Sequence, residues 1–168
     1  MAQTTINELV STTNPGMPGQ LADMAMDDAV SRLLEGSDDV AFGIALAQGT
    51  ADNGVVAPGS GGEVVGVLLH SHAYAKDPGG DLSLTDPALL HPKSVVSALR
   101  KGRVWVKVGE NVAAGDRAWV RTDTGHKGEW AKSSIAANAI DCSKQARYMT
   151  TATSGNMAVL EVDFTNKA

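Results

Sequence analysis

The sequence contains one cysteine, few aromatic residues and no apolar run long enough to cross a bilayer. Because an internal disulfide needs two cysteines, Cys142 is expected to be a free thiol, which suits synthesis in a reducing compartment. Stretches such as VAFGIALA at 40–47 fall far short of the roughly 20 apolar residues of a membrane-spanning helix. The N-terminus MAQTTINELV lacks the basic region and apolar core of a signal peptide. These absences predict a soluble protein made in a cytoplasm, with no membrane partner.

The composition indicates a β-rich protein. Glycine accounts for 18 of the 168 residues, and alanine, valine and threonine are plentiful where leucine and lysine are few, which favours strands and turns. A chain of this length buries roughly 70% of the surface that its unfolded state exposes. A stable core therefore needs neither a disulfide nor a metal ion.

Charge is unevenly distributed behind a formal net charge of −5. Residues 93–132 carry nine Lys and Arg against four acids, whereas the rest of the chain carries five against fifteen. The acids are densest in residues 23–39. Opposite charges separated along a chain favour either an internal contact or a contact between neighbouring molecules.

Residues 1–20 predict an extended N-terminal arm. They contain no Lys or Arg, one acid, and two X-Pro steps each followed by glycine, which is turn chemistry without a periodic face. Their apolar residues are too few to bury one another: Ile6, Leu9, Val10 and Met17. We expect this arm to be mobile in isolation, and to become ordered where these side chains contact a partner.

Residues 21–168 predict a single all-β domain, either a small barrel or a jelly-roll-like β-sandwich, with seven to nine short strands. Within residues 21–35 propensity favours a helix and alternation favours a strand, and we adopt the strand. Residues 76–93 contain three prolines and predict a long loop excursion. The other strand-like segments are 39–47, 63–74, 94–108 with a kink or bulge at Gly102, 112–122, 128–135 and 157–164.

Two short runs, RVWVKV and RAWVRT, show the clearest alternation and look like paired strands. In each run a tryptophan and two basic residues share one face: Arg103, Trp105 and Lys107, then Arg117, Trp119 and Arg121. The opposite faces are apolar or small, which predicts that they form the core. The tryptophans therefore lie on the basic side of their strands.

Motifs that could carry catalysis or metal binding are weak. The triplet 123–125 is Asp-Thr-Gly, as in aspartic proteases, but it precedes His-Lys-Gly and suits an exposed turn better than an apolar dyad. His70 and His72 face the same way on a strand, yet no third metal ligand has a diagnostic spacing. The glycine-rich loop 59–62 lacks the rest of a phosphate-binding motif. We predict no enzyme activity, no cofactor and no metal.

Three hypotheses account for the basic tryptophan face. It could bind single-stranded nucleic acid by stacking and phosphate contacts, although the net negative charge argues against this. The Lys and Arg stems could simply cover the indoles. It could also be a protein interface, where Trp and Arg are the residue types most enriched at hot spots. We favour the protein interface and keep the nucleic-acid hypothesis as the alternative.

Several segments occur in a characteristic order: PGQLAD (18–23), DDVAFGIALAQG (38–49), EVVGVLLHSHAY (63–74), LRKGRVWVKV (99–108) and VAAGDRAWVRTDTG (112–125). In this order they resemble the structural cement, or head-decoration, proteins of tailed bacteriophages. The resemblance implies an all-β accessory protein on the outer surface of an icosahedral capsid, made in the cytoplasm of a bacterial host. It would bridge and stabilise major capsid protein subunits, and it carries over no catalytic residues.

The resemblance also implies self-association, with a trimer as the favoured state. An arm that cannot bury its own apolar residues is suited to lie along a neighbouring subunit, by adding a strand to its sheet. Several modest contacts on one shell would raise the avidity by about 10²–10⁴ over a single contact.

Overall fold

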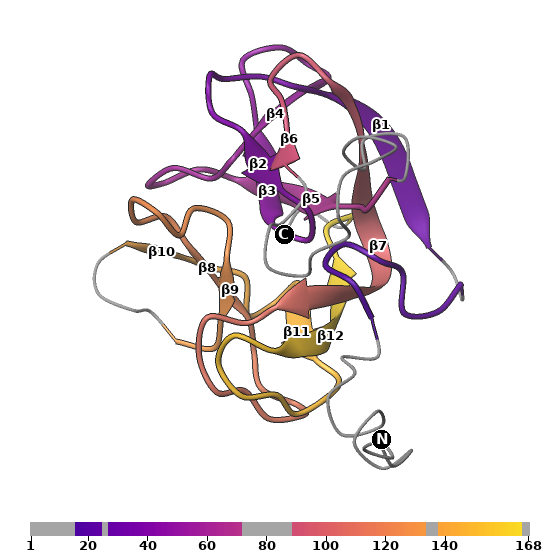
Figure 1. The fold of residues 1–168 in the computed structure, drawn as a ribbon, viewed down its shortest axis with the longest axis vertical. Coiled ribbons are helices and arrows are strands. Elements are labelled where there is room, and N and C mark those ends of the chain that lie inside the picture. Colours follow the sequence, from indigo (N-terminus) through magenta and orange to yellow (C-terminus); the bar gives the residue numbers. More distant parts are fainter. Residues whose placement is uncertain (1–15, 25–26, 72–88, 134–137, 166–168) are drawn as a thin grey trace, which may run out of the picture.

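The computed structural model describes residues 16–24, 27–71, 89–133 and 138–165, and within them every regular element is a strand (Figure 1). None of these residues forms a helix, so none forms a helix able to span a membrane. The strands are β1 (Asp28–Leu34), β2 (Val40–Ala41), β3 (Ala45–Gln48), β4 (Gly54–Val56), β5 (Val64–Leu68), β6 (Leu89–Leu90), β7 (Val95–Lys107), β8 (Trp119–Arg121), β9 (Trp130–Ala131), β10 (Ala139–Asp141), β11 (Ala146–Tyr148) and β12 (Met157–Asp163).

Five strands close into a small barrel. They follow the order β1-β4-β3-β5-β7, and the barrel closes because β1 also pairs antiparallel with β7. The short pair β2–β6 adds its side chains to the barrel core. That core consists mainly of aliphatic residues: Leu34, Val40, Phe42, Ile44, Leu46, Val55, Leu68, Leu90, Val96 and Ala98. The predicted all-β small barrel is confirmed.

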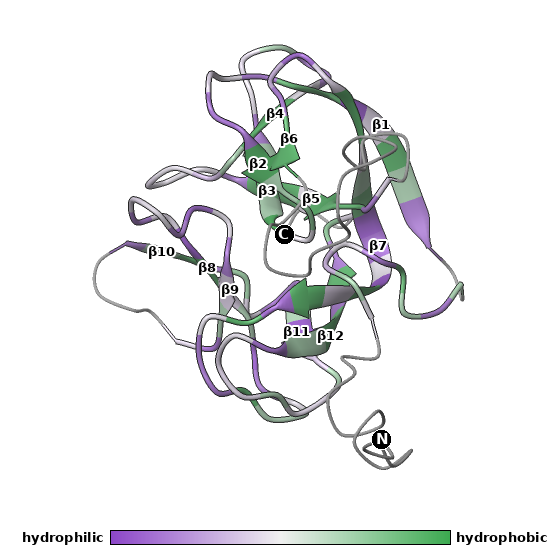
Figure 2. Cartoon of the chain, viewed as in Figure 1, coloured by the Kyte–Doolittle hydropathy of each residue, from purple (hydrophilic) through white to green (hydrophobic). Residues whose placement is uncertain are grey.

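A second unit is built on the far half of β7. There β12 pairs with β7, β11 pairs with β12, and the three-stranded sheet β10-β8-β9 contributes to the same core. Its largest fully buried side chains are Trp130, Tyr148, Leu99 and Leu160. Figure 1 shows β7 running from the barrel into this unit, and Figure 2 shows a hydrophilic stretch in the middle of β7 between hydrophobic strands.

The long strand β7 changes the face that it buries near its middle. Val96 packs in the barrel core, whereas Leu99 and Val104 pack in the second core. The pairing with β1 skips Arg100, and one extra residue in a strand reverses the alternation that follows. Gly102 has a φ of 137°, where side chains are strained. A kink or bulge was predicted at Gly102, but the residue that the pairing skips is Arg100, two positions earlier, and Gly102 itself pairs with Val162. The irregularity at Arg100 lets one strand contribute to two cores.

Residues 28–34 form a strand, as predicted, because the edges of β4 and β7 offer hydrogen-bond partners that override helical propensity. The prediction that the two tryptophan runs pair with each other is wrong. β7 pairs with β1, β5 and β12, whereas β8 pairs with β9 and β10. Alternation specifies which face of a strand is buried, but it does not specify the neighbouring strand.

The structure also contains more strands than the predicted seven to nine. The additional strands, among them β10 and β11, are only two or three residues long and have no clear alternation of their own. The predicted excursion at 76–93 lies outside the described residues except at its end, where β6 forms.

Candidate interaction surface

The edge of β7 that faces away from β12 is covered by the chain's own N-terminal segment, residues 16–22. Gly19 N donates to the carbonyl oxygen of Trp105 at 2.8 Å, and Trp105 N donates to the carbonyl oxygen of Gln20 at 2.8 Å. Ala22 N donates to the carbonyl oxygen of Arg103 at 2.9 Å. The backbone of Gly16 lies against the indole of Trp105, and a Cβ at Gly16 would overlap the ring. Trp105 is therefore half-buried under its own chain.

This segment is the last part of the arm predicted over residues 1–20. Met17, one of the predicted contact residues, lies here with 39% of its surface exposed. The other three predicted arm contacts, Ile6, Leu9 and Val10, lie outside the described residues. The arm therefore enters the described structure alongside β7.

A row of alternating charges crosses the outer face of the second unit. Arg103 contacts the carboxylates of Asp23 at 3.0 Å and Glu161 at 3.1 Å. On the next strand Arg147 contacts the other oxygen of Glu161 at 2.6 Å. Register explains the row, because Arg103 and Arg147 each lie opposite Glu161 in its two neighbouring strands. Arg103, which the sequence placed on a partner-binding face, is thus held in an internal network.

These contacts fix the charge states of the row. The guanidinium of Arg147, with that of Arg103, lowers the pKa of Glu161 against the opposing effect of burial. Hydrogen bonds from Arg103 to Asp23 and Glu161 raise its own pKa. Hydrogen bonds from Thr165, and the ammonium of Lys101 at 3.1 Å, lower the pKa of Asp163. Glu161 and Asp163 are therefore carboxylates, and Arg103 is a guanidinium cation, at neutral pH.

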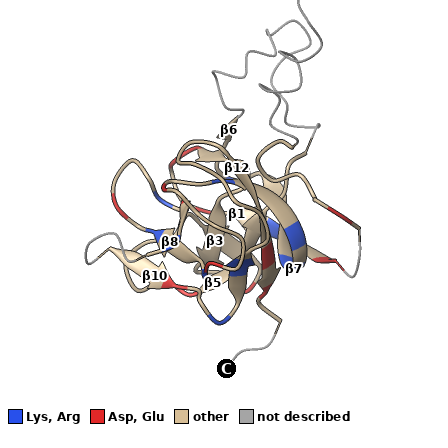
Figure 3. Ribbon diagram, turned by 90° about the horizontal axis from the view of Figure 1, so that it is seen from below, with Lys and Arg blue, Asp and Glu red and all other residues tan. Residues whose placement is uncertain are grey.

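A groove with an excess of positive charge lies beside this row, over β7, β12 and β11. Five cationic and two acidic side chains line it, and its volume is about 410 Å³. The lining residues are Lys101, Gly102, Arg103, Arg117, Lys144, Gln145, Ala146, Arg147, Glu161, Val162 and Asp163. Figure 3 shows basic positions on β7 with acidic positions close by.

Two of the five cations lack a close ion pair in the described part of the chain, although Lys144, after the hydrogen bonds from Ser143, also lowers the pKa of Asp141 through its charge. Within the described residues neither Arg117 nor Lys144 has an ion pair within 4.0 Å. Arg117 reaches the groove because its backbone pairs with that of Arg147. The sequence indicated Arg103 and Arg117 but missed Lys101, Lys144 and Arg147, which only strand register brings to them. The alternation of residues 157–163 was the available signal, since it puts both acids on one face.

The rest of the predicted tryptophan face is distributed elsewhere. Lys107 is exposed at the end of β7, and Trp119 is half-buried on β8. The side chain of Arg121 is only 14% exposed and contacts Asp123 at 2.7 Å and Glu129 at 3.7 Å. Of the six predicted residues, only Arg103 and Arg117 line the groove.

The segregated charges of the sequence meet partly within the molecule. Acidic Asp23 contacts basic Arg103, and Asp28 lies 3.7 Å from Arg100. Two further acids of residues 23–39, Asp38 and Asp39, contact Lys127 at 4.0 Å and His91 at 2.7 Å. Most of the acidic residues in this segment therefore contact basic residues of the same molecule.

The motifs considered for catalysis have structural roles. Asp123 begins the turn between β8 and β9, and the guanidinium of Arg121 lowers its pKa, whereas an aspartic protease dyad must share a proton. Burial raises the pKa of the Cys142 thiol to about 12, which leaves it protonated and unreactive.

The metal-binding hypothesis gains no support from the described residues. His70 packs on the ring of Phe42 with centroids 4.7 Å apart, and His72 lies outside the described part. Across that part, no three His, Cys, Asp or Glu side chains are placed to share an ion.

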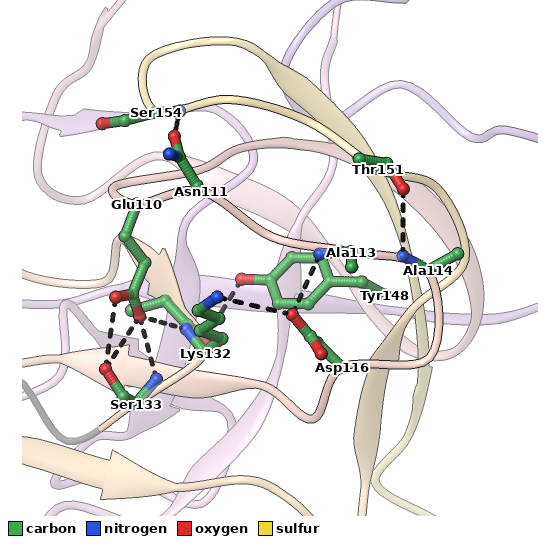
Figure 4. A network of polar contacts seen from close by, with 11 residues as sticks. Glu110, Asn111, Ala113, Ala114, Asp116, Lys132, Ser133, Tyr148, Thr151 and Ser154 are labelled. Carbon is green, nitrogen blue, oxygen red and sulfur yellow. Dashed lines mark hydrogen bonds and ion pairs between the residues drawn. The ribbon is translucent and has the colours of Figure 1, made fainter.

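Side chains fasten the loops at the far end of the second unit (Figure 4). Glu110 accepts hydrogen bonds from the backbone of Lys132 at 2.5 Å and Ser133 at 2.9 Å. Asn111 accepts one from Ser154 N at 2.9 Å, and Tyr148 donates to the carbonyl of Ala131 at 3.1 Å. These hydrogen bonds link the loop after β7 to residues that follow β9 and β11.

Two comparisons with known proteins give a match, one to a protein family and one to a solved structure. A family model described as structural cement protein (E217 gp24/Pam3 gp6) matches residues 4–163. A chain from the capsid of Myoviridae phage XM1 is similar in structure, with a TM-score of 0.63 over 90% of this chain and 92% of that chain. Its sequence is 12% identical, so this likeness concerns the fold alone. A search of curated proteins gives no match.

Proposed function

The chain belongs to the phage structural cement proteins, and from this membership we propose that it binds the outer surface of a phage capsid and bridges neighbouring major capsid protein subunits. The match over residues 4–163 is the observation that carries the proposal. In this role the protein acts without catalysis, is made in the host cytoplasm and becomes part of the virion. It stabilises the shell by joining subunits.

The way in which the arm meets the domain supports bridging. Residues 19–22 add a strand to the edge of β7, and β7 is the longest strand and belongs to both cores. Antiparallel hydrogen bonds lie perpendicular to the strands. A force on the arm parallel to β7 would therefore act on all of these hydrogen bonds at once. Force from a neighbouring subunit would therefore be spread over the whole molecule.

We further propose that residues 1–15 contact a neighbouring subunit through Ile6, Leu9 and Val10, and that copies self-associate, with a trimer favoured. A bridge of this kind depends on multivalency, in which a first contact makes later contacts intramolecular. Deleting residues 1–15 should leave both cores folded and weaken capsid attachment by about 10²-fold or more, as expected when one of several linked contacts is lost. Unchanged attachment would exclude the arm as a bridge.

The decisive experiment is co-sedimentation of the purified protein with phage heads that lack it. Saturable binding, at a copy number that matches the shell lattice, is expected. Absence of binding to intact heads would overturn the proposal. Sedimentation velocity of the free protein tests self-association separately.

The alternative function is binding of single-stranded nucleic acid, and the excess of cations in the groove is the observation that favours it. Against it, none of the described residues that line the groove is aromatic and able to stack on bases. A labelled oligonucleotide in the same sedimentation experiment separates the two functions. Binding to the oligonucleotide without binding to heads would support the alternative.

A further inference from the structure

We infer that the groove over β7, β12 and β11 docks an acidic segment of the major capsid protein. This inference rests on the proposed function and assigns a surface and a partner chemistry to it. The groove presents three guanidinium groups and two ammonium groups around two carboxylates. A carboxylate-bearing chain is the ligand that such a set recognises, since guanidinium forks match carboxylates geometrically.

The internal contacts prepare the groove for this ligand. Glu161 accepts from Arg103 and Arg147 on either side, which holds both guanidinium groups in fixed positions. Lys101 is held in the same way by Asp163 at 3.1 Å. Groups that are already oriented lose less side-chain entropy when a ligand arrives, so they bind at lower cost.

The unpaired cations give the groove its free positive charge. Arg117 and Lys144 are both exposed, and within the described residues neither forms an ion pair. Arg117 lies just before β8 and Lys144 just before β11. Lys101 and Arg103 lie on β7, at the opposite side of the groove. An extended acidic segment lying between them would meet positive charge on both sides.

Protein fits the groove better than nucleic acid. Single-strand binding surfaces combine cations with exposed aromatic faces, whereas the lining residues within the described ranges include no aromatic side chain. The nearest tryptophan on β7, Trp105, is covered by the backbone of Gly16. The carboxylates of Glu161 and Asp163 would also repel a continuous run of phosphates, but a peptide can space its acids around them.

A second copy of this chain is the poorer occupant. Its acidic residues 23–39 are largely committed to internal contacts, as with Asp23 on Arg103 and Asp28 beside Arg100. Glu35 accepts hydrogen bonds from Thr50 N at 2.7 Å and Ala51 N at 3.0 Å within its own loop. Charge complementarity therefore points to another protein.

The test removes the two groove cations that form no close ion pair in the described part of the chain. The variant R117Q/K144Q keeps the row of Arg103, Glu161 and Arg147 intact, and R117Q and K144Q lie on exposed positions. The matched control is K93Q/K127Q, which has the same change in net charge at exposed positions outside the groove. Both are compared with the wild-type protein for binding to heads that lack it.

We expect R117Q/K144Q to bind heads roughly tenfold more weakly or worse, and the control to stay within about twofold of the wild type. Binding of the wild type should weaken as salt increases, since charged contacts are screened. Oligoglutamate should compete with heads for the wild type at a lower concentration than a single-stranded oligonucleotide of equal charge.

The outcomes separate this inference from the proposed function. If the wild type does not bind heads, the proposed function fails. If the wild type, the control and R117Q/K144Q bind equally, capsid binding stands and the groove inference is overturned. Stronger competition by the oligonucleotide would reassign the groove to nucleic acid. Loss of self-association in R117Q/K144Q with unchanged head binding would reassign it to a second copy.

Discussion

At the scale of single residues, Trp130 links the two cores. It is fully buried in the second core, and its indole Nε1 donates to the carbonyl oxygen of Gly43 at 2.9 Å. Gly43 lies between β2 and β3, beside the barrel residues Phe42 and Ile44. One side chain therefore supplies core volume to one unit and a hydrogen bond to the other.

Replacing Trp130 with Phe should lower the free energy of unfolding by about 1–3 kcal/mol, because a buried carbonyl loses its donor and the smaller ring leaves space. Urea unfolding followed by circular dichroism measures this change. W119F is the control, since Trp119 is half-buried and should cost less than about 1 kcal/mol, as is usual away from the core. Equal losses in the two variants would contradict the assigned role.

Glu161 makes stability depend on pH. Its pKa lies below the ordinary value of 4.5, chiefly because Arg147 and then Arg103 hydrogen-bond to it. The carboxylate therefore stabilises the fold fully above pH 4.5, and this contribution disappears as the pH falls toward the lowered pKa.

Urea midpoints measured from about pH 7 down to about pH 3 should fall less steeply with acid in E161Q than in the wild type. The control D52N changes an exposed carboxylate outside the row and should keep the wild-type slope. Identical slopes in E161Q and the wild type would show that the row contributes nothing to acid sensitivity.

At the scale of elements, the segment of residues 16–22 depends on a glycine. The backbone of Gly16 lies on the indole of Trp105, where a methyl group does not fit. Overpacking of this kind costs typically about 1–3 kcal/mol. G16A should therefore loosen the segment while leaving the cores intact.

Amide hydrogen exchange measures this effect. In G16A the amides of Gly19 and Ala22 should exchange about tenfold faster or more, because their opening loses at least roughly 1.4 kcal/mol. Gly59 provides the control, since nothing lies within 4 Å of a Cβ built there. Unchanged protection in G16A would mean that the segment does not rest on the indole.

Strands whose sequences alternate were predictable, and their neighbours were not. The alternation around Trp105 and Trp119 correctly gave the buried faces of β7 and β8, since Val104 and Val120 are fully buried. It gave no information on which strands pair, because the backbone of an alternating strand can form its hydrogen bonds with the edge of any other strand. A glycine inside a strand indicated an irregularity at Gly102, but the residue that the pairing skips is Arg100, two positions earlier.

The residues that share the groove could not be predicted from the sequence either. Arg103 and Glu161 are 58 residues apart in sequence and meet only through the register of β7 with β12. Lys144 precedes β11, a strand of three residues with no pattern of its own. Residue types indicated a basic interaction face, but which cations share a groove depends on strand order, which the sequence does not specify.

At the scale of the whole molecule, the two cores are joined closely enough to unfold together. β7 supplies side chains to both, and Ala45 N in the barrel donates to the carbonyl of Gly128 in the β8–β9 turn at 2.9 Å. Trp130 adds its hydrogen bond to Gly43. Neither core can lose β7 without exposing part of the other.

A substitution in one core should therefore shift the unfolding midpoint measured by a spectroscopic probe in the other core. Leu46 is fully buried in the barrel core, whereas the buried tryptophan, Trp130, lies in the second core. L46A should cost about 2–5 kcal/mol, and it should lower the urea midpoint of tryptophan fluorescence as much as that of circular dichroism. L160A, in the second core, should likewise lower both midpoints together. If L46A instead produced an early circular dichroism transition with an unchanged fluorescence midpoint, the barrel would unfold independently, and force applied to the arm would not be shared by the two cores.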